Sequence, residues 1–208
     1  MVIETLAAQW TVTPGSVGWF PPDLKHKAWV PGNATGHSLY LDTLFCGHFP
    51  CHAGVYGADP LIVALLDRCH HNAPSSPEAY QSLLLTLLGY EIRQRPELPL
   101  ELKLPTDRRA RNVASELLNH PEGIKDQSQL AQQAGLSVRT LSRLFTQQTG
   151  LNFSQWRQQA KVVASLRWIL AGLPVNDVAS RSGYSNVSAY IEAFRKRFGK
   201  TPGQFKKA

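Results

Sequence analysis

The chain has 208 residues, a net charge of +7 and an apolar fraction of 43%, which suits one large folded domain or two small ones. No stretch approaches the roughly 20 uncharged apolar residues of a membrane span, and no basic segment precedes an apolar run at the start, so neither a membrane protein nor a secretory signal is expected. Cys46, Cys51 and Cys69 are an odd number of cysteines, which favours reduced thiols in the cytoplasm over a disulfide framework.

The charge is divided unevenly along the chain. Residues 105–208 contain 16 Lys/Arg and 6 Asp/Glu, a net of +10, whereas residues 1–104 contain 6 and 9, a net of −3. A basic half next to a mildly acidic half indicates that the C-terminal half meets a polyanion. The alternative is a basic surface that only makes the protein soluble, and the charge alone does not exclude it.

Residues 1–56 have the composition of strands and turns. Trp10, Val12, Val17, Trp19 and Phe20 favour strands, and Pro-Gly and Pro-Pro pairs interrupt them. The spacing Gly-x5-Pro-x-Asp-x2-His, from Gly15 to His26, resembles the second conserved stretch of the cupin β-barrel, although Asp23 and Val30 depart from it. The first cupin stretch, with its metal ligands, would lie upstream, so we expect an incomplete barrel.

Metal binding is the chemical alternative for this region. Cys46, His48, Cys51 and His52 gather soft and imidazole ligands, but Cys51 and His52 are adjacent, and Phe49-Pro50 fits a turn before a strand. His26 alone cannot form a site. We therefore interpret the four as barrel-wall residues and expect no metal site and no cofactor.

Two helices should follow. Asp59 caps and Pro60 opens the first, which ends near His71, where His70 and His71 suit the negative helix end. Ser76 caps and Pro77 opens the second, which ends near Gln94. Leucines line one face of the second helix, and they can form core or a surface for a second copy of the protein.

Residues 96–107 contain three prolines and alternating leucines without a helical period. This composition predicts a semi-extended linker rather than a folded element. Because composition and charge both change here, we expect two domains, residues 1–104 and 105–208.

The stretch 130–145 predicts a helix, a glycine turn and a second helix that Ser137 caps. Leu141, Leu144 and Phe145 form its apolar stripe, and the opposite face is polar. This arrangement is a helix-turn-helix. A helix near residues 110–118 precedes it, and a long helix over 153–171 follows.

The unit recurs after the long helix. Ala131-x3-Gly135 matches Ala179-x3-Gly183 at a shift of 48 residues, and Phe145-x4-Gly150 matches Phe194-x4-Gly199 at a shift of 49. The second copy therefore has one extra turn residue, which makes Asn186 its N-cap.

Residues 105–205 resemble the AraC/XylS family of bacterial transcription regulators, through this double repeat, Gly183-Tyr184 and the ending from Phe198 to Phe205. The cupin-like fragment, Leu39–Leu41, Cys46, Cys51 and the helix pair look like the sensor half of a cupin-bearing subgroup that includes a repressor of a drug-efflux gene. The resemblance implies an α+β protein. A partial cupin-like β region and a helix pair, for sensing or oligomerisation, precede an all-α domain with two helix-turn-helix units joined by a long helix.

A joining helix of about 18 residues is about 27 Å long, which can hold two recognition helices near the roughly 34 Å separation of successive major grooves. Counted from each N-cap, positions +1, +2, +5 and +6 should face DNA bases. These positions are Val138, Arg139, Ser142, Arg143, Val187, Ser188, Ile191 and Glu192. The alternative for Glu192 is a place on a solvated helix face. For Arg139 and Arg143 the alternatives are a solvated helix face or a phosphate contact.

Cations beside these positions are expected to bind DNA phosphates. Such contacts position a protein on DNA without specifying the base sequence. They are Arg157, Lys161, Arg195, Lys196, Arg197 and Lys200. The sequence thus predicts a cytoplasmic regulator that binds promoter DNA and controls an efflux or metabolic gene. The expected partners are double-stranded DNA, a small-molecule effector, and a second copy of the chain that binds through the N-terminal half. The rivals are a metal-binding or enzymatic cupin with an incidental basic tail, and an architectural DNA binder without specificity. No catalytic motif is found, and the sequence leaves activation or repression open.

Overall fold

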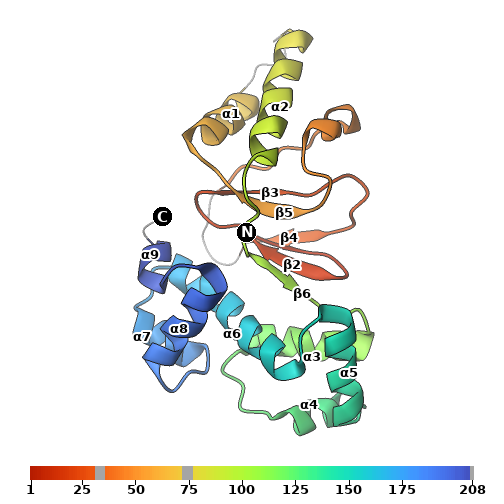
Figure 1. Ribbon diagram of the computed structural model, residues 1–208, viewed down its shortest axis with the longest axis vertical. Coiled ribbons are helices and arrows are strands. Elements are labelled where there is room, and N and C mark those ends of the chain that lie inside the picture. The colour runs from red at the N-terminus through yellow and green to blue at the C-terminus, as the bar shows by residue number, and fades with distance from the viewer. Residues whose placement is uncertain (31–35, 72–76, 207–208) are drawn as a thin grey trace.

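A computed structural model describes residues 1–30, 36–71 and 77–206, and it places three layers in sequence along the long axis (Figure 1). Helices α1 and α2 lie at one end, the strands lie in the middle, and the helices of the C-terminal half lie at the other end. None of the helices in the described part of the chain combines the length and apolar composition that a membrane span needs.

The strands form two small antiparallel sheets. The first has the order β4-β1-β2-β6, from Lys27–Trp29, Val2–Glu4, Ala8–Thr11 and Glu101–Lys103. The second pairs β3, Ser16–Trp19, with β5, Gly54–Gly57, so that Ser16 lies opposite Gly57. The expectation of strands and turns in this region is confirmed, but the two sheets do not close into a barrel among the described residues, and the cupin resemblance stays a prediction.

Strand β2 is buried on both faces. Ala8 and Trp10 join the core of the C-terminal helices, and Gln9 and Thr11 are buried as well. Trp10 packs edge-on against Phe20, with ring centres 5.5 Å apart. Strand β2 is therefore an interior strand, whereas β4 at the edge of the same sheet is exposed.

Helices α1 and α2 pack on a second core with the β3–β5 sheet. Helix α1 spans Pro60–His70 and begins where Asp59 accepts a hydrogen bond from the Ile62 N–H. Helix α2 spans Glu78–Arg93 after Pro77, while the expected cap Ser76 lies outside the described residues. A short 3-10 helix, η1, spans Thr43–His48. The second core consists of Trp19, Phe49, Tyr56, Ile62, Leu65, Leu88 and Ile92.

The C-terminal half is helical, as expected. Its helices are α3 (Arg108–Asn119), α4 (Gln127–Gln133), α5 (Val138–Thr149), α6 (Phe153–Leu170), α7 (Val175–Arg181), α8 (Val187–Phe198) and α9 (Pro202–Lys206). Capping boxes begin α4, at Asp126 and Gln129, and α6, at Asn152 and Gln155. Each box satisfies backbone donors at both ends of the first turn, so these helices begin at defined residues.

The expectation of a linker without folded structure at 96–107 is wrong. Residues 101–103 form β6, which pairs with β2 so that Leu102 lies opposite Gln9. Leu100, Leu102 and Leu104 are almost fully buried in the core of the helical half. This core therefore runs across residue 105, and the proposed boundary between residues 104 and 105 stays a prediction.

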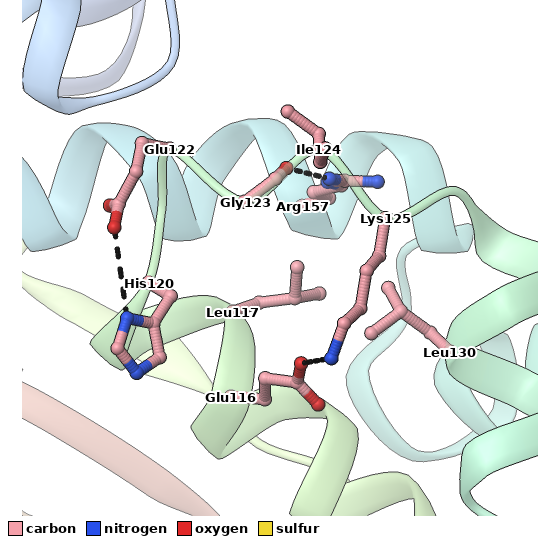
Figure 2. A pocket seen from close by; sticks show the side chains of 9 residues that line it. All are labelled: Glu116, Leu117, His120, Glu122, Gly123, Ile124, Lys125, Leu130 and Arg157. Atoms are coloured by element: carbon pink, nitrogen blue, oxygen red, sulfur yellow. Dashed lines mark hydrogen bonds and ion pairs between the residues drawn. The ribbon is translucent and has the colours of Figure 1, made fainter.

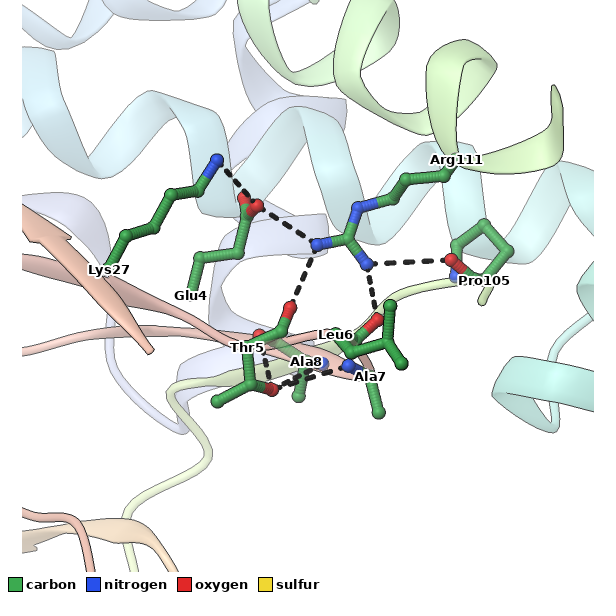
Figure 3. Close-up of polar contacts among 8 residues, drawn as sticks. All are labelled: Glu4, Thr5, Leu6, Ala7, Ala8, Lys27, Pro105 and Arg111. Carbon is green, nitrogen blue, oxygen red and sulfur yellow. Dashed lines mark hydrogen bonds and ion pairs between the residues drawn. The ribbon is translucent and has the colours of Figure 1, made fainter. Parts of the chain in front are cut away.

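One arginine of α3 docks the helical half onto the turn between β1 and β2 (Figure 3). Arg111 donates to the Leu6 and Thr5 carbonyls, at 2.6 and 2.9 Å, and pairs with the Glu4 carboxylate at 2.9 Å. Lys27 of β4 pairs with the same carboxylate at 2.9 Å. Because Arg111 and Glu4 are both largely shielded from water, this contact fixes α3 against the sheet more firmly than an exposed ion pair would.

Candidate nucleic-acid interface

The first helix-turn-helix unit consists of α4, a tight turn and α5. Gly135 adopts a left-handed φ of 65°, and the Leu136 N–H bonds to the Ala131 carbonyl at 2.9 Å across the turn. Ser137 caps α5 by accepting a hydrogen bond from the Thr140 N–H at 3.1 Å. The turn and the cap together set the direction in which α5 leaves the unit.

Helix α5 buries one face and exposes the other. Leu141 and Phe145 are fully buried, and Phe145 packs edge-on against Trp156 of α6 with ring centres 5.0 Å apart. Val138, Arg139 and Arg143 are exposed, as expected for base-reading positions. The three side chains are available to a macromolecule that approaches this face.

Ser142, the fourth expected position of this unit, is half-buried. Its hydroxyl accepts a hydrogen bond from the Gln127 side-chain amide of α4 at 2.7 Å. Sequence reasoning missed Gln127, because a single glutamine in the first turn of a helix gives no sign of its partner. Ser142 thus links the two helices of the unit as well as lying on its outer face.

The second unit, α7 and α8, repeats the geometry of the first. Gly183 has a φ of 71°, and the Tyr184 N–H bonds to the Ala179 carbonyl at 3.0 Å, as in the first turn. Asn186 caps α8 through the Ser188 N–H at 2.8 Å. The internal repeat in the sequence is therefore a repeat in structure, and the extra turn residue is accommodated before the cap.

The outer face of α8 is less polar than that of α5. Ser188 and Glu192 are exposed, whereas Val187 and Ile191 are half-buried and pack against the core. On the inner face, Tyr190 is fully buried and its hydroxyl lies 2.9 Å from the Ser165 hydroxyl of α6. Burial raises the pKa of Tyr190 to about 12, against a smaller opposite effect of this hydrogen bond.

The six cations expected to contact phosphates fall into two groups. Arg195, Lys196 and Lys200 are exposed at the end of α8 and just beyond it. Arg157, Lys161 and Arg197 instead donate to main-chain carbonyls within the protein, those of Gly123, Gly183 and Glu101.

Arg197 lies differently from the three exposed cations, and its expected phosphate contact stays a prediction. Its guanidinium is directed at the carbonyl of Glu101 in β6, although it lies only one residue after Lys196. The indole N–H of Trp156 in α6 donates to another carbonyl of β6, that of Lys103, at 2.7 Å. Both helix-turn-helix units are thus connected to the same short strand, one through Arg197 of α8 and the other through Trp156, against which α5 packs.

A hollow of about 510 Å³ lies beside the first unit, between α3, the loop after it, α4 and α6 (Figure 2). Its polar groups pair with one another, Lys125 with Glu116 at 2.6 Å and His120 with Glu122 at 3.6 Å. Leu117 and Leu130 form its apolar floor, and Ile124 at its rim is almost fully exposed. The paired charges leave the hollow without a convergent set of unsatisfied polar groups.

The cysteines and histidines of the N-terminal half do not gather into a metal site in the described part of the chain. Cys46 and His48 lie in η1, so they are not strand residues of a barrel wall as expected. Cys51 and His52 contact each other, with Sγ and Nδ1 3.4 Å apart. The Nδ1 atom of exposed His26 lies 2.7 Å from the carbonyl oxygen of Leu24.

Comparison with known proteins matches residues 130–208 to the family described as "Helix-turn-helix domain". The chain is 29% identical over 199 residues to the HTH-type transcriptional regulator NimR of Escherichia coli K12, covering 95% of this chain and 72% of that protein. It is 29% identical over 139 residues to the arabinose operon regulatory protein of the same organism, covering 65% and 48%. The crystal structure of the DNA-binding domain of AdpA, in complex with a target DNA, is 28% identical, with a TM-score of 0.44, over 48% of this chain and 90% of that one. Residues 130–208 thus match a helix-turn-helix domain, and the chain is similar to transcriptional regulators that carry an AraC-type domain.

Proposed function

We propose that this protein regulates transcription by binding promoter DNA with α5 and α8 in two successive major grooves. The observation that carries the proposal is the pair of matching units on one helix. Phe145 of α5 packs on Trp156 near the start of α6, and Tyr190 of α8 bonds to Ser165 near its end. Eighteen helical residues span about 27 Å, close to the groove repeat of roughly 34 Å.

The base-reading set is proposed from the outer faces of the two helices. Arg139 and Arg143 would bond guanine O6 and N7 in bidentate fashion. In α8, Glu192 would accept from a cytosine amino group, Ser188 would bond a base edge, and Val187 would touch a thymine methyl. Val138, Ser142 and Ile191 complete the set on the same faces. Because the two arginines belong to α5, the first unit would carry most of the base discrimination.

Exposed cations at the end of α8 would hold the phosphate backbone. Arg195, Lys196 and Lys200 are exposed, and the described residues include no acidic partner for them. Contacts of this kind give affinity on any sequence and fix the protein's register on the duplex. The net charge of +10 in residues 105–208 supports this assignment.

The N-terminal half is proposed to sense and to oligomerise. Helix α2 exposes Leu83, Leu87 and Tyr90, an apolar face that suits contact with a second copy of the chain. A small-molecule effector and an efflux or metabolic target gene follow from the sequence resemblance. A promoter-binding regulator of this kind would act in the cytoplasm without catalysing a reaction.

The function is tested by retention of DNA on the purified protein. Genomic fragments of the source organism compete with random DNA of equal length at 150 mM salt, and the retained fragments are sequenced. The proposal predicts a small set of fragments held about 10³-fold or more tightly than random DNA. Uniform retention of all fragments would instead identify an architectural DNA binder without specificity.

A further inference from the structure

Two cations on α6 are directed at carbonyl groups of the protein rather than at solvent. Arg157 and Lys161 lie four residues apart, so they share one face of the helix. Arg157 donates to the Gly123 carbonyl at 2.7 Å, and Lys161 donates to the Gly183 carbonyl at 2.9 Å. Figure 2 shows Arg157 reaching the loop that contains Gly123.

The two carbonyls lie next to different helix-turn-helix units. Gly123 lies in the loop that leads from α3 into α4 of the first unit, and Gly183 is the turn glycine of the second. A Cβ atom at Gly183 would lie 2.9 Å from the Pro121 oxygen and 3.0 Å from the Glu122 Cα. The loop that leads into the first unit therefore packs directly on the turn of the second, and the two cations lie beside this contact.

The surroundings of both cations limit their access to water. Each is only partly exposed, and burial lowers the pKa of both, with the charge of Arg157 lowering that of Lys161 further. The Lys161 ammonium also lies 5.6 Å from the ring centre of Tyr184, a cation–π distance. Both hydrogen bonds come from charged donors, which form stronger bonds than neutral donors do.

DNA presents its major grooves at a fixed repeat, so a chain that uses two recognition helices needs them at one separation. We propose that Arg157 and Lys161 are positioning residues that hold α5 and α8 at one spacing and relative orientation, by tying the 120–124 loop and the turn at Gly183 to the same face of α6. The consequence for DNA binding rests on the proposed function, whereas the effect on helix placement is a property of the free protein.

The positioning role is tested in the free protein by pulsed electron paramagnetic resonance, which measures the distance between two spin labels. Labels at Gln147→Cys of α5 and Ser180→Cys of α7 are introduced after the three native cysteines are replaced by serine. The parent should give one narrow distance distribution, and Arg157→Met with Lys161→Met should broaden or shift it. The conservative pair Arg157→Lys and Lys161→Arg keeps a donor at each carbonyl and should restore the narrow distribution, which separates the lost bonds from a lost fold.

Arg93→Met is the control, because it removes an exposed charge from α2, a helix at the other end of the molecule from the helix-turn-helix units. It should leave the distance unchanged. An unchanged distribution in the Arg157→Met, Lys161→Met protein would overturn the positioning role, whatever its DNA binding.

The consequence for DNA is tested with the site recovered by selection from a random library, and with versions that carry one base pair inserted or removed between its two halves. The parent should prefer the selected spacing by about tenfold or more, comparable to the loss of one base-pair contact, and the double methionine variant should lose most of that preference. An equal loss at every spacing, with a shallower salt dependence, would show phosphate contact instead and overturn the proposal. A parent with a narrow distance distribution but no sequence preference would refute the proposed function and leave the positioning role standing.

Discussion

Replacement of Arg143 by alanine tests the assignment of α5 to base reading. Arg143 is exposed, and in the described part of the chain it forms no hydrogen bond or ion pair with another residue. Its removal should therefore leave the free energy of unfolding within about 0.5 kcal/mol of the parent. Any large effect on DNA binding then belongs to the interface.

The magnitude follows from the contact that Arg143 would form. One bidentate arginine–guanine pair contributes about 1–3 kcal/mol, which is roughly a 5- to 150-fold change in Kd. The loss should be confined to one base pair, where the variant should accept all four bases more equally. Elsewhere in the site the order of preference should stay as in the parent.

The assay is fluorescence anisotropy at fixed salt on a panel of duplexes, in which each base pair of the selected site is replaced in turn. Random DNA of the same length is the reference. Equal losses of affinity on the selected site and on random DNA would refute base reading by Arg143 and assign it to phosphate contact.

Three further predictions concern other parts of the molecule. Lys196→Ala should weaken binding to all sequences similarly and reduce the slope of log K against log salt by about 1, which a salt titration measures. Tyr190→Phe should lower the free energy of unfolding by about 1 kcal/mol in urea, because the bond to Ser165 is lost. In the folded protein the pKa of Tyr190 is raised from an ordinary value of 10 to about 12. The contribution of its protonated hydroxyl to the free energy of unfolding is therefore fully present below pH 10 and decreases as the pH rises towards 12. The phenylalanine variant should lack this decrease in urea titrations at pH 10–12. Arg111→Ala should release the turn between β1 and β2, so amide exchange should rise near Leu6 while DNA affinity of α5 and α8 changes little, and unchanged exchange would contradict the docking role.

The helices of the C-terminal half were predictable because local and tertiary preferences agree there. Ser137 and Asn186 stand before amphipathic stretches, and Gly135 and Gly183 provide the left-handed residues that the turns require. Each signal lies within a few residues of the element it defines. The repeat then gave the two-unit arrangement without any long-range information.

Strand β6 was missed although its leucines alternate. Leu100, Leu102 and Leu104 follow the period of a strand, but Pro99 and Pro105 flank a segment in which only three residues pair. The strand forms because β2 offers an edge on one side and the helical half covers the leucines. Neither surface can be inferred from the segment itself.

The assignment of cations was limited by the same lack of long-range information. Arg195 and Arg197 look equivalent in the sequence, yet one is exposed and the other reaches the Glu101 carbonyl. Arg157 and Lys161 likewise bond to loops 34 and 22 residues away. A helical cation is drawn to the nearest unpaired carbonyl, and only the fold determines where that carbonyl lies.

The central claim, that one chain reads two successive major grooves, is tested most directly by sequencing DNA selected from a random library by the purified protein. The claim predicts two separate blocks of preferred bases with centres about 10–10.5 base pairs apart, the first block more strongly defined than the second. A single block, or no block above the random background, would contradict it.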